Sequence, residues 1–302
     1  MPGSDNFLIE QAYVHSFNRA NPNSPEVLSQ LTEKLELLQS LLADKGISFT
    51  FLITPSKAEV YPEKIPDNFL HPERDSRQSD YLTFLQSTKD KKINLVDAAK
   101  LTKELKKTSK HPVFAPGGIH WSYLTACKVS QVLVDEIANQ LSKDLQRPVC
   151  EPVEFRTKPY GTETDMLRLL NLWDETAWKA PFPYPPMKKS FYDAKKYHPT
   201  VLVVGDSFSL TPLHFFDKDG TFRKRRLMYY FSTEYNFWTT PKEKGFKKNS
   251  NVRTYPGKIK ADWDKILEDR DAVVIFVNER DIVSAGHGFI DHILNYLQKS
   301  TT

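Results

Sequence analysis

The chain has 302 residues, of which 39% are hydrophobic and 26% charged, a balance typical of a globular protein that is long enough to bury a core. Its 42 basic and 38 acidic residues leave a net charge of only +4, and no nucleic-acid-binding motif is present, so we do not expect a nucleic-acid partner. No apolar run reaches the ~20 residues that a membrane span needs, and the first residues lack the apolar segment of a signal peptide.

The first strong elements are a helix that leads directly into a strand. Ser24 and Pro25 are typical of a helix start, and leucines then recur every three or four residues as far as Leu42. Gly46 is expected to end this helix, and residues 47–54 form an apolar stretch that predicts a strand. A helix followed at once by a strand favours an α/β fold.

Further predicted elements follow along the chain. We predict a helix near residues 81–89, a short strand at 92–96 and a long helix over 124–141, directly after His120 and Trp121. Four prolines between residues 180 and 186 predict a loop. Cys127 and Cys150 are too few for a disulfide framework; they could form a bridge, but their spacing does not require one, and it fits no metal site.

The most informative segment is a buried strand over residues 201–204 that ends at Gly205, Asp206 and Ser207. Strands over 227–231 and 272–277 and a final helix over 287–298 complete the pattern, which predicts a single domain over residues 1–302. Polar residues follow three of the predicted strands, namely Lys57, Asp206 with Ser207, and Asn278 with Glu279 and Arg280. If these strands are parallel, the polar residues meet at one edge of the sheet, where such folds bind ligands.

Ser207 and His120 are the candidate catalytic residues. A serine hydroxyl needs a base to become a nucleophile, and the pKa of histidine suits that role. The backbone N–H of Ser207, with Asn278 or Arg280, could stabilise an oxyanion. Each residue also has a structural interpretation, because Asp206 could simply cap the next helix and His120 could be satisfied at a helix start. Five other histidines compete for the role of base, namely His111, His198, His214, His287 and His292.

Six segments together resemble the catalytic domain of the alginate O-acetyltransferase family, the AlgX/AlgJ-like branch of the SGNH hydrolases. They occur in the family's order at residues 6–13, 54–66, 120–122, 161–167, 205–208 and 278–280, and they span nearly the whole chain. The resemblance implies an SGNH-hydrolase-like α/β fold, a three-layer sandwich with a mostly parallel central sheet. It also implies an acyl-transfer site with Ser207 as nucleophile and His120 as general base, and no cofactor or metal.

The chain departs from the family at the third member of the triad. The family's aspartate lies two residues before the histidine, and Gly118 occupies that place here. Loss of the carboxylate in a triad enzyme lowers kcat by about 10⁴-fold. Three explanations stay open: a carboxylate from elsewhere, with Asp165 the first candidate and Glu279 the second; a working Ser-His pair; or a degenerate domain that binds glycan.

The resemblance implies an O-acetyltransferase that passes an acetyl group through Ser207 to a polysaccharide outside the cytoplasm, with a leader or membrane anchor that this stretch of sequence lacks. A membrane-bound O-acyltransferase would be the acetyl donor. The rivals are a carbohydrate acetylesterase and a non-catalytic glycan-binding or assembly subunit. Lys57 and Trp121 join Asn278 and Arg280 as candidate oxyanion or substrate-binding residues. The aromatic residues available for sugar stacking are Tyr13, Trp121, Trp173, Phe182, Tyr184 and Trp238.

Overall fold

A seven-stranded sheet forms the centre of the computed structural model, which describes residues 1–19, 22–172, 181–242 and 245–299. In spatial order the strands are β2 (Leu95–Asp97), β1 (Ser48–Thr54), β9 (Ala272–Asn278), β5 (Thr200–Gly205), β6 (Lys224–Tyr229), β7 (Thr233–Pro241) and β8 (Phe246–Thr254). The first five pair in parallel, and β7 and β8 extend the sheet as an antiparallel hairpin. The predicted mostly parallel sheet is confirmed.

The central strands are buried on both faces, which explains their continuous apolar sequences. In β9, Val273 and Ile275 face one hydrophobic core, whereas Val274 and Phe276 face the other. Successive side chains of a strand point to opposite faces, so each apolar residue contributes to a core on its own side. The sheet is therefore the middle layer of a three-layer sandwich.

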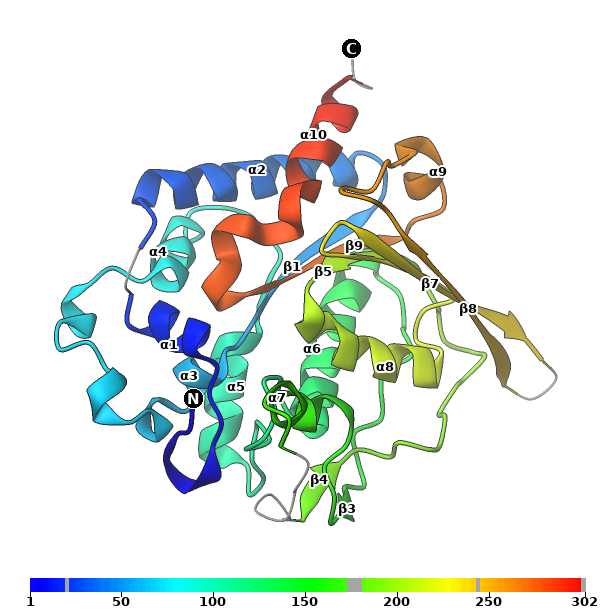
Figure 1. Cartoon of the computed structure of the whole chain (residues 1–302). Coiled ribbons are helices and arrows are strands. Elements are labelled where there is room, and N and C mark those ends of the chain that lie inside the picture. Colours follow the sequence, from blue (N-terminus) through cyan, green and yellow to red (C-terminus); the bar gives the residue numbers. More distant parts are fainter. Residues whose placement is uncertain (20–21, 173–180, 243–244, 300–302) are drawn as a thin grey trace.

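Helices cover both faces of the sheet (Figure 1). One core contains residues of α2 (Pro25–Ala43), α4 (Asp80–Ser87), α9 (Trp263–Leu267) and α10 (Phe289–Lys299). The other contains residues of α1 (Gln11–Phe17), α3 (Lys57–Val60), α6 (Tyr123–Leu141) and α8 (Leu210–Asp219). In the described part of the chain the other helices are α5 (Ala98–Thr108), α7 (Asp165–Leu169) and the 3-10 helices η1 (Ser4–Asn6), η2 (Pro62–Lys64), η3 (Asp67–Phe69), η4 (Arg74–Ser76), η5 (Gly161–Thr164), η7 (Ser207–Ser209) and η8 (Glu279–Gly288).

The register of the sheet brings the polar residues after three strands to one edge. Thr54 at the end of β1 lies opposite Asn278 of β9, and Val204 of β5 lies opposite Ile275 of the same strand. Because β9 separates β1 from β5, the chain segments that leave all three strands start side by side. The expected convergence at the carboxyl edge is confirmed.

The predicted loop over residues 180–186 is wrong for the part that the structure describes. Phe182–Tyr184 form β4, which pairs antiparallel with β3 (Glu154–Arg156) and places Pro183 opposite Phe155. A proline lacks only its own N–H, so an extended two-stranded edge can accept one. The last helix also starts later than predicted, at Phe289, because the 3-10 helix η8 precedes it.

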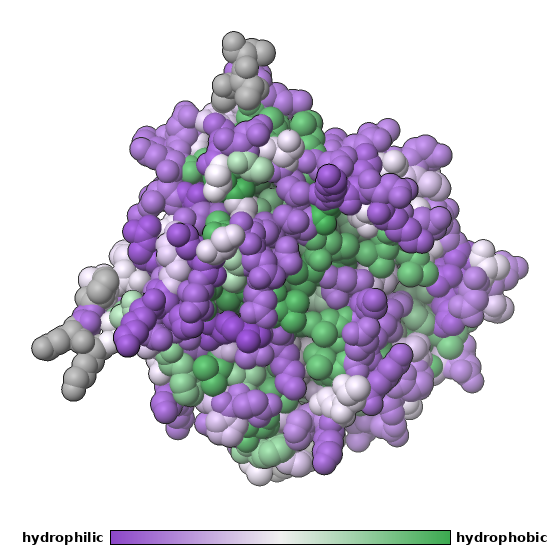
Figure 2. Space-filling model, turned by 180° about the vertical axis from the view of Figure 1, so that it is seen from behind, coloured by the Kyte–Doolittle hydropathy of each residue, from purple (hydrophilic) through white to green (hydrophobic). Residues whose placement is uncertain are grey.

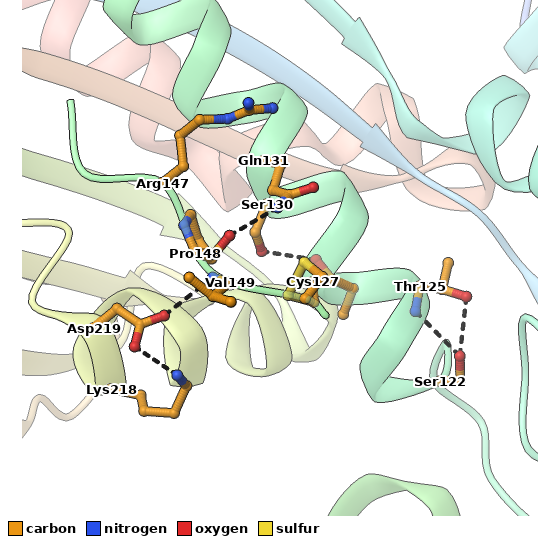
Figure 3. Close-up of a disulfide and its surroundings, with 12 residues drawn as sticks. Ser122, Thr125, Cys127, Ser130, Gln131, Arg147, Pro148, Val149, Lys218 and Asp219 are labelled. Atoms are coloured by element: carbon orange, nitrogen blue, oxygen red, sulfur yellow. Dashed lines mark hydrogen bonds and ion pairs between the residues drawn. A yellow bond between two sulfur atoms is a disulfide. The ribbon is translucent and has the colours of Figure 1, made fainter. Parts of the chain in front are cut away.

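Cys127 of α6 and Cys150 form a disulfide with their Cα atoms 5.8 Å apart (Figure 3). Around it, the Gln131 side chain donates a hydrogen bond to the carbonyl of Pro148 at 2.8 Å. The backbone N–H of Val149 donates to Asp219, a fully buried residue of α8 that also pairs with Lys218. The segment after α6 is thus bound to both α6 and α8.

The face opposite to the view of Figure 1 is mainly hydrophilic, and hydrophobic residues reach its surface in a band near the centre (Figure 2). Among the described residues no helix has the length and apolar character needed to cross a membrane. The same residues contain no group of three or more His, Cys, Asp or Glu side chains arranged to hold a metal ion.

Candidate active site

Ser207 lies at a sharp turn between β5 and α8. Gly205 is needed just before it, because a Cβ there would come within 2.9 Å of the Phe276 Cβ on the neighbouring strand. The Asp206 side chain then caps η7 by accepting a hydrogen bond from Phe208 N, and its other oxygen accepts one from Asn278 N at 3.1 Å. Burial raises the pKa of Asp206 to about 6. The turn leaves Ser207 partly exposed at the edge of the sheet.

The hydroxyl of Ser207 is hydrogen-bonded to His120. The distance from Ser207 Oγ to His120 Nε2 is 2.8 Å, within the range expected of a nucleophile and its general base. His120 is 7% exposed, and its ring packs on Phe208 with the ring centroids 4.6 Å apart. Of the histidines in the sequence, His120 is the one that this turn brings to Ser207.

Asp165, the first residue of α7, completes the series. Its Oδ2 lies 2.5 Å from His120 Nδ1, and its Oδ1 accepts a hydrogen bond from the backbone N–H of Ile119 at 2.7 Å. The carboxylate therefore holds both the imidazole ring and the backbone next to it. This is the arrangement in which an acid fixes the tautomer of a histidine and stabilises its charged form.

Gly118 leaves room for the segment that carries Asp165. A Cβ on Gly118 would lie 2.7 Å from the carbonyl oxygen of Thr162 and 2.9 Å from Glu163 Cα, distances that a real Cβ does not show. Leu167 N also donates to the carbonyl of Gly117 at 3.3 Å. The space around this position is thus filled by the backbone of η5, which enters α7 at Asp165. The paired glycines before Ile119 were the sequence signal for such a close approach.

The buried side chain of Glu163 stabilises η5 through hydrogen bonds. Its carboxylate accepts hydrogen bonds from the hydroxyl of Tyr184 and from the backbone N–H of Tyr160. The side chain is almost fully buried, and burial raises the pKa of Glu163 to about 7. The strand β4 that contains Tyr184 therefore helps to place the acid segment, a role that the sequence did not indicate.

Lys57, a candidate oxyanion or substrate-binding residue, uses its ammonium group within the protein. The side chain is 1% exposed, and its ammonium group donates to the backbone carbonyls of Leu8, Ala115, Pro116 and Gly118. Burial lowers the pKa of Lys57 to about 7, and the negative charge of Asp165 opposes this shift. The residue anchors the loop that leads to His120.

Glu279, the second candidate acid, binds Ser56 instead of His120. Its Oε1 accepts hydrogen bonds from Ser56 N at 3.1 Å and Ser56 Oγ at 2.5 Å. Burial and the negative charge of Glu59 raise the pKa of Glu279 to about 8. Its position just after β9 turns the side chain towards β1, and in this structure Asp165, not Glu279, contacts His120.

The side-chain amide of Asn278 is hydrogen-bonded within the protein, whereas part of the Arg280 side chain is exposed to solvent. The side-chain amide of Asn278 donates to the carbonyl of Pro55 at 3.0 Å and to Thr54 Oγ1, which joins the ends of β9 and β1. Both of these hydrogen bonds are made within the protein, whereas the oxyanion role expected of Asn278 would need a free donor. The guanidinium of Arg280 lies 5.2 Å from the centroid of the Tyr13 ring, and Arg280 Nε pairs with Asp281 at 3.2 Å, but a third of its side chain is exposed.

Comparison of the chain with known protein families identifies the family to which it belongs. Residues 13–219 match the family described as "SGNH hydrolase-like domain, acetyltransferase AlgX", which is more than half of the chain. The chain belongs to this family. It is thus an SGNH-type acetyltransferase, as the sequence segments indicated. No curated protein matches the sequence closely enough to serve as a relative.

Solved structures share the fold of this SGNH-type acetyltransferase at low sequence identity. The O-acetyltransferase domain of Pseudomonas putida AlgJ is 17% identical, with a TM-score of 0.50 over 94% of this chain and 92% of that one. PatB1 of Bacillus cereus with a sulfonyl adduct is 12% identical, with a TM-score of 0.54 over 88% of this chain and 93% of that one. These likenesses show that the SGNH-like fold extends over nearly the whole acetyltransferase.

Most of the aromatic residues that could have stacked on sugar lie in the core of the acetyltransferase. Trp121, a candidate substrate-binding residue, is fully buried against Phe208. Three others are also buried, namely Tyr13, Phe182 and Tyr184, and Trp173 lies outside the described residues. Trp238 on β7 is the exception, with 36% of its surface exposed.

Proposed function

We propose that this acetyltransferase passes an acetyl group through Ser207 to a hydroxyl group of a polysaccharide. The observation that carries the proposal is the hydrogen-bonded series from Ser207 through His120 to Asp165. Membership in an acetyltransferase family favours transfer to a sugar over hydrolysis by water and over a purely glycan-binding role.

In the first step, His120 Nε2 takes the proton of Ser207 while Oγ attacks the carbonyl carbon of the acetyl donor. Asp165 stabilises the imidazolium that forms. The oxygen of the tetrahedral intermediate carries the negative charge, and we assign the backbone N–H of Ser207 as one of its donors. When the bond to the donor's leaving oxygen breaks, His120 returns the proton to that oxygen, and the acetyl group remains on Ser207.

In the second step, a sugar hydroxyl takes the place of the departed group. His120 removes its proton, the sugar oxygen attacks the acetyl carbon, and the bond to Ser207 Oγ breaks as Oγ regains a proton from His120. One ester bond is formed for each one broken, so no cofactor is needed. We assign contact with the acceptor to Arg280, whose side chain is partly exposed near Tyr13.

The disulfide supports an extracytoplasmic location, because such bonds persist in oxidising compartments and are rare in the cytosol. We therefore infer that the acceptor is a periplasmic or cell-surface polysaccharide. A membrane-bound O-acyltransferase would then deliver the acetyl group across the membrane. The name of the AlgJ domain, an O-acetyltransferase, supports the same reaction.

The test compares the wild-type protein with Ser207→Ala and His120→Ala on a chromogenic acetyl ester, with and without a soluble polysaccharide. We expect turnover in the wild type alone, an acetyl adduct on the intact protein that Ser207→Ala lacks, and ester groups on the polysaccharide.

Two results would reject the proposal in different ways. Release of free acetate at the same rate with and without polysaccharide, and no acetylated product, would make the protein an esterase. Absence of both turnover and adduct in the wild type would leave a glycan-binding protein.

A further inference from the structure

The β7–β8 hairpin carries the strongest unexplained surface of the molecule. It continues the sheet past the parallel strands and reaches away from the helical layers (Figure 1). Nothing in the proposed acyl transfer uses it, because Trp238 lies opposite Lys224 at the start of β6, whereas Ser207 follows the far end of β5. Most residues of β8 are exposed, and so are Trp238 and Thr240 of β7, although both segments are regular strands.

The register of the hairpin assigns its side chains to two faces. Residues directly opposite in an antiparallel pair share a face, so Trp238 lies with Asn249, and Asn236 with Asn251. Hydrogen bonds confirm this face: Asn236 donates to Asn251 at 3.0 Å, and Asn249 donates to Thr240 at 3.0 Å. We call this the Trp238 face. On the other face Phe237 is buried beside Arg225.

The Trp238 face combines an aromatic surface with two amide groups, each of which uses only one of its two polar atoms within the described part of the protein. Trp238 is exposed beside Asn249 and Asn251, which lie on the adjacent strand. Within the described residues, the side-chain oxygen of Asn249 and the side-chain NH₂ of Asn251 make no hydrogen bond. An acceptor and a donor that stand two residues apart on a strand can bind neighbouring hydroxyl groups, while an indole ring offers an apolar surface with a polar edge.

The charge of the hairpin is positive. Exposed Lys247 and Arg253 lie on the Trp238 face at its two ends, and Lys242 and Lys248 add to the charge of the hairpin. The acidic residue of the described strands β7 and β8, Glu234, is buried and pairs with Arg226. The face therefore attracts anionic rather than cationic ligands.

We propose that the Trp238 face binds an acidic polysaccharide chain at a distance from Ser207. The apolar side of a sugar ring would lie on Trp238, its hydroxyl groups would bind Asn249 and Asn251, and its carboxylates would lie near Lys247 and Arg253. In naming the ligand as the acceptor of the acetyl group, this inference rests on the proposed function. The surface holds a long chain on the enzyme while one of its sugars reaches the site.

The test measures binding of the full chain to a soluble polyuronate and to neutral dextran by affinity electrophoresis. We expect Trp238→Ala and the double variant Asn249→Ala with Asn251→Ala each to weaken polyuronate binding by about tenfold or more. Val252→Ala is the matched control, because Val252 is 60% exposed on the other face of the same hairpin and should bind as the wild type does.

Turnover of the small chromogenic ester separates this proposal from the acyl-transfer proposal. We expect ester turnover to be unchanged in all of these variants. When the same substitutions are made in the Ser207→Ala protein, they should still weaken polyuronate binding. Wild-type binding by Trp238→Ala would overturn the inference, as would equal binding of dextran and polyuronate. A wild type without ester turnover, but with binding that depends on Trp238, would reject the acyl transfer alone.

Discussion

Asp165 supplies from a distant segment the carboxylate that the family places two residues before the histidine. What the histidine needs is an oxygen at Nδ1, and the 2.5 Å contact provides it whatever segment it comes from. The sequence could offer Asp165 only as one candidate among several, because neither its spacing nor its neighbours indicate where η5 packs.

We predict that Asp165→Asn lowers kcat for a chromogenic acetyl ester by about 10⁴-fold, because an amide cannot stabilise the imidazolium. Adding Gly118→Asp should not restore activity, since a side chain at Gly118 meets the backbone of Thr162 and Glu163. Recovery of kcat in the double variant would show that η5 yields to the new side chain, and that the fit described for Gly118 is wrong.

Lys57 is the second residue whose role lies in its position. Replacing it by methionine leaves buried carbonyls without a donor, and each such group costs about 1–3 kcal/mol. We predict that Lys57→Met lowers the free energy of unfolding by about 3 kcal/mol or more, measured by urea denaturation. Lys265→Met is the control, because that side chain is 79% exposed and should leave the midpoint unchanged. Equal midpoints for the two variants would contradict the anchoring role.

At the scale of elements, the disulfide fixes the segment that follows α6. Cys127 and Cys150 are separated by 23 positions, and closing a loop of that size stabilises a protein by about 3 kcal/mol through the unfolded chain. We predict that the double variant Cys127→Ala with Cys150→Ala loses about that much free energy of unfolding while its ester turnover at low temperature stays at the wild-type level. Dithiothreitol should lower the stability of the wild type and leave the variant unaffected. A variant as stable as the wild type would mean that Gln131 and Asp219 suffice to hold the segment.

The elements that sequence could predict are those whose burial gives them a clear pattern. Residues 201–204 and 272–277 are apolar throughout because both of their faces are buried, and the leucine stripe of α2 follows from one buried side. The β7–β8 hairpin was not predicted from the sequence, because its strands are polar and lack an alternation of apolar and polar residues. The strand β4 escaped because prolines are usually read as a break, although here the backbone only has to be extended.

For the molecule as a whole, Glu279 is one of several buried groups through which pH acts on stability, and its shift is larger than those of Asp206 and Glu163. The pKa of its carboxyl group rises from an ordinary value of 4.5 to about 8 in the folded protein, so the folded state keeps a proton that the unfolded chain releases. The contribution is therefore fully present below pH 4.5 and is lost as pH rises towards 8, with a slope of at most about 1.4 kcal/mol per pH unit.

We predict that Glu279→Gln removes this pH dependence, because an amide oxygen can still accept the hydrogen bonds from Ser56. Denaturation curves from pH 5 to 8 should show the wild type losing stability relative to the variant. Parallel curves over that range would mean that Glu279 is ionised in the folded protein.

At this scale the sequence predicted that polar residues gather at the carboxyl edge of the sheet. It did not predict which role each of them has there. The sequence places Lys57, Ser207 and Asn278 after three strands, and parallel pairing then brings them together. It does not say which of them face solvent, because that depends on the loops above the edge. Lys57 and Asn278 turned out to be used within the protein, and Ser207 remained accessible.

The separation of acid and base has a mechanical consequence. In a chain whose acid lies two residues before its histidine, the two groups move together as one rigid piece. Here Asp165 belongs to α7, a short helix in which Leu167 N donates a hydrogen bond to the carbonyl of Gly117. His120 belongs to the loop that Lys57 anchors. The contact between Asp165 and His120 therefore depends on how α7 and η5 pack against Gly117, Gly118 and Ile119, whereas the hydrogen bond between His120 and Ser207 does not involve α7. We expect substitutions that loosen this packing to act first on the acid and only indirectly on Ser207.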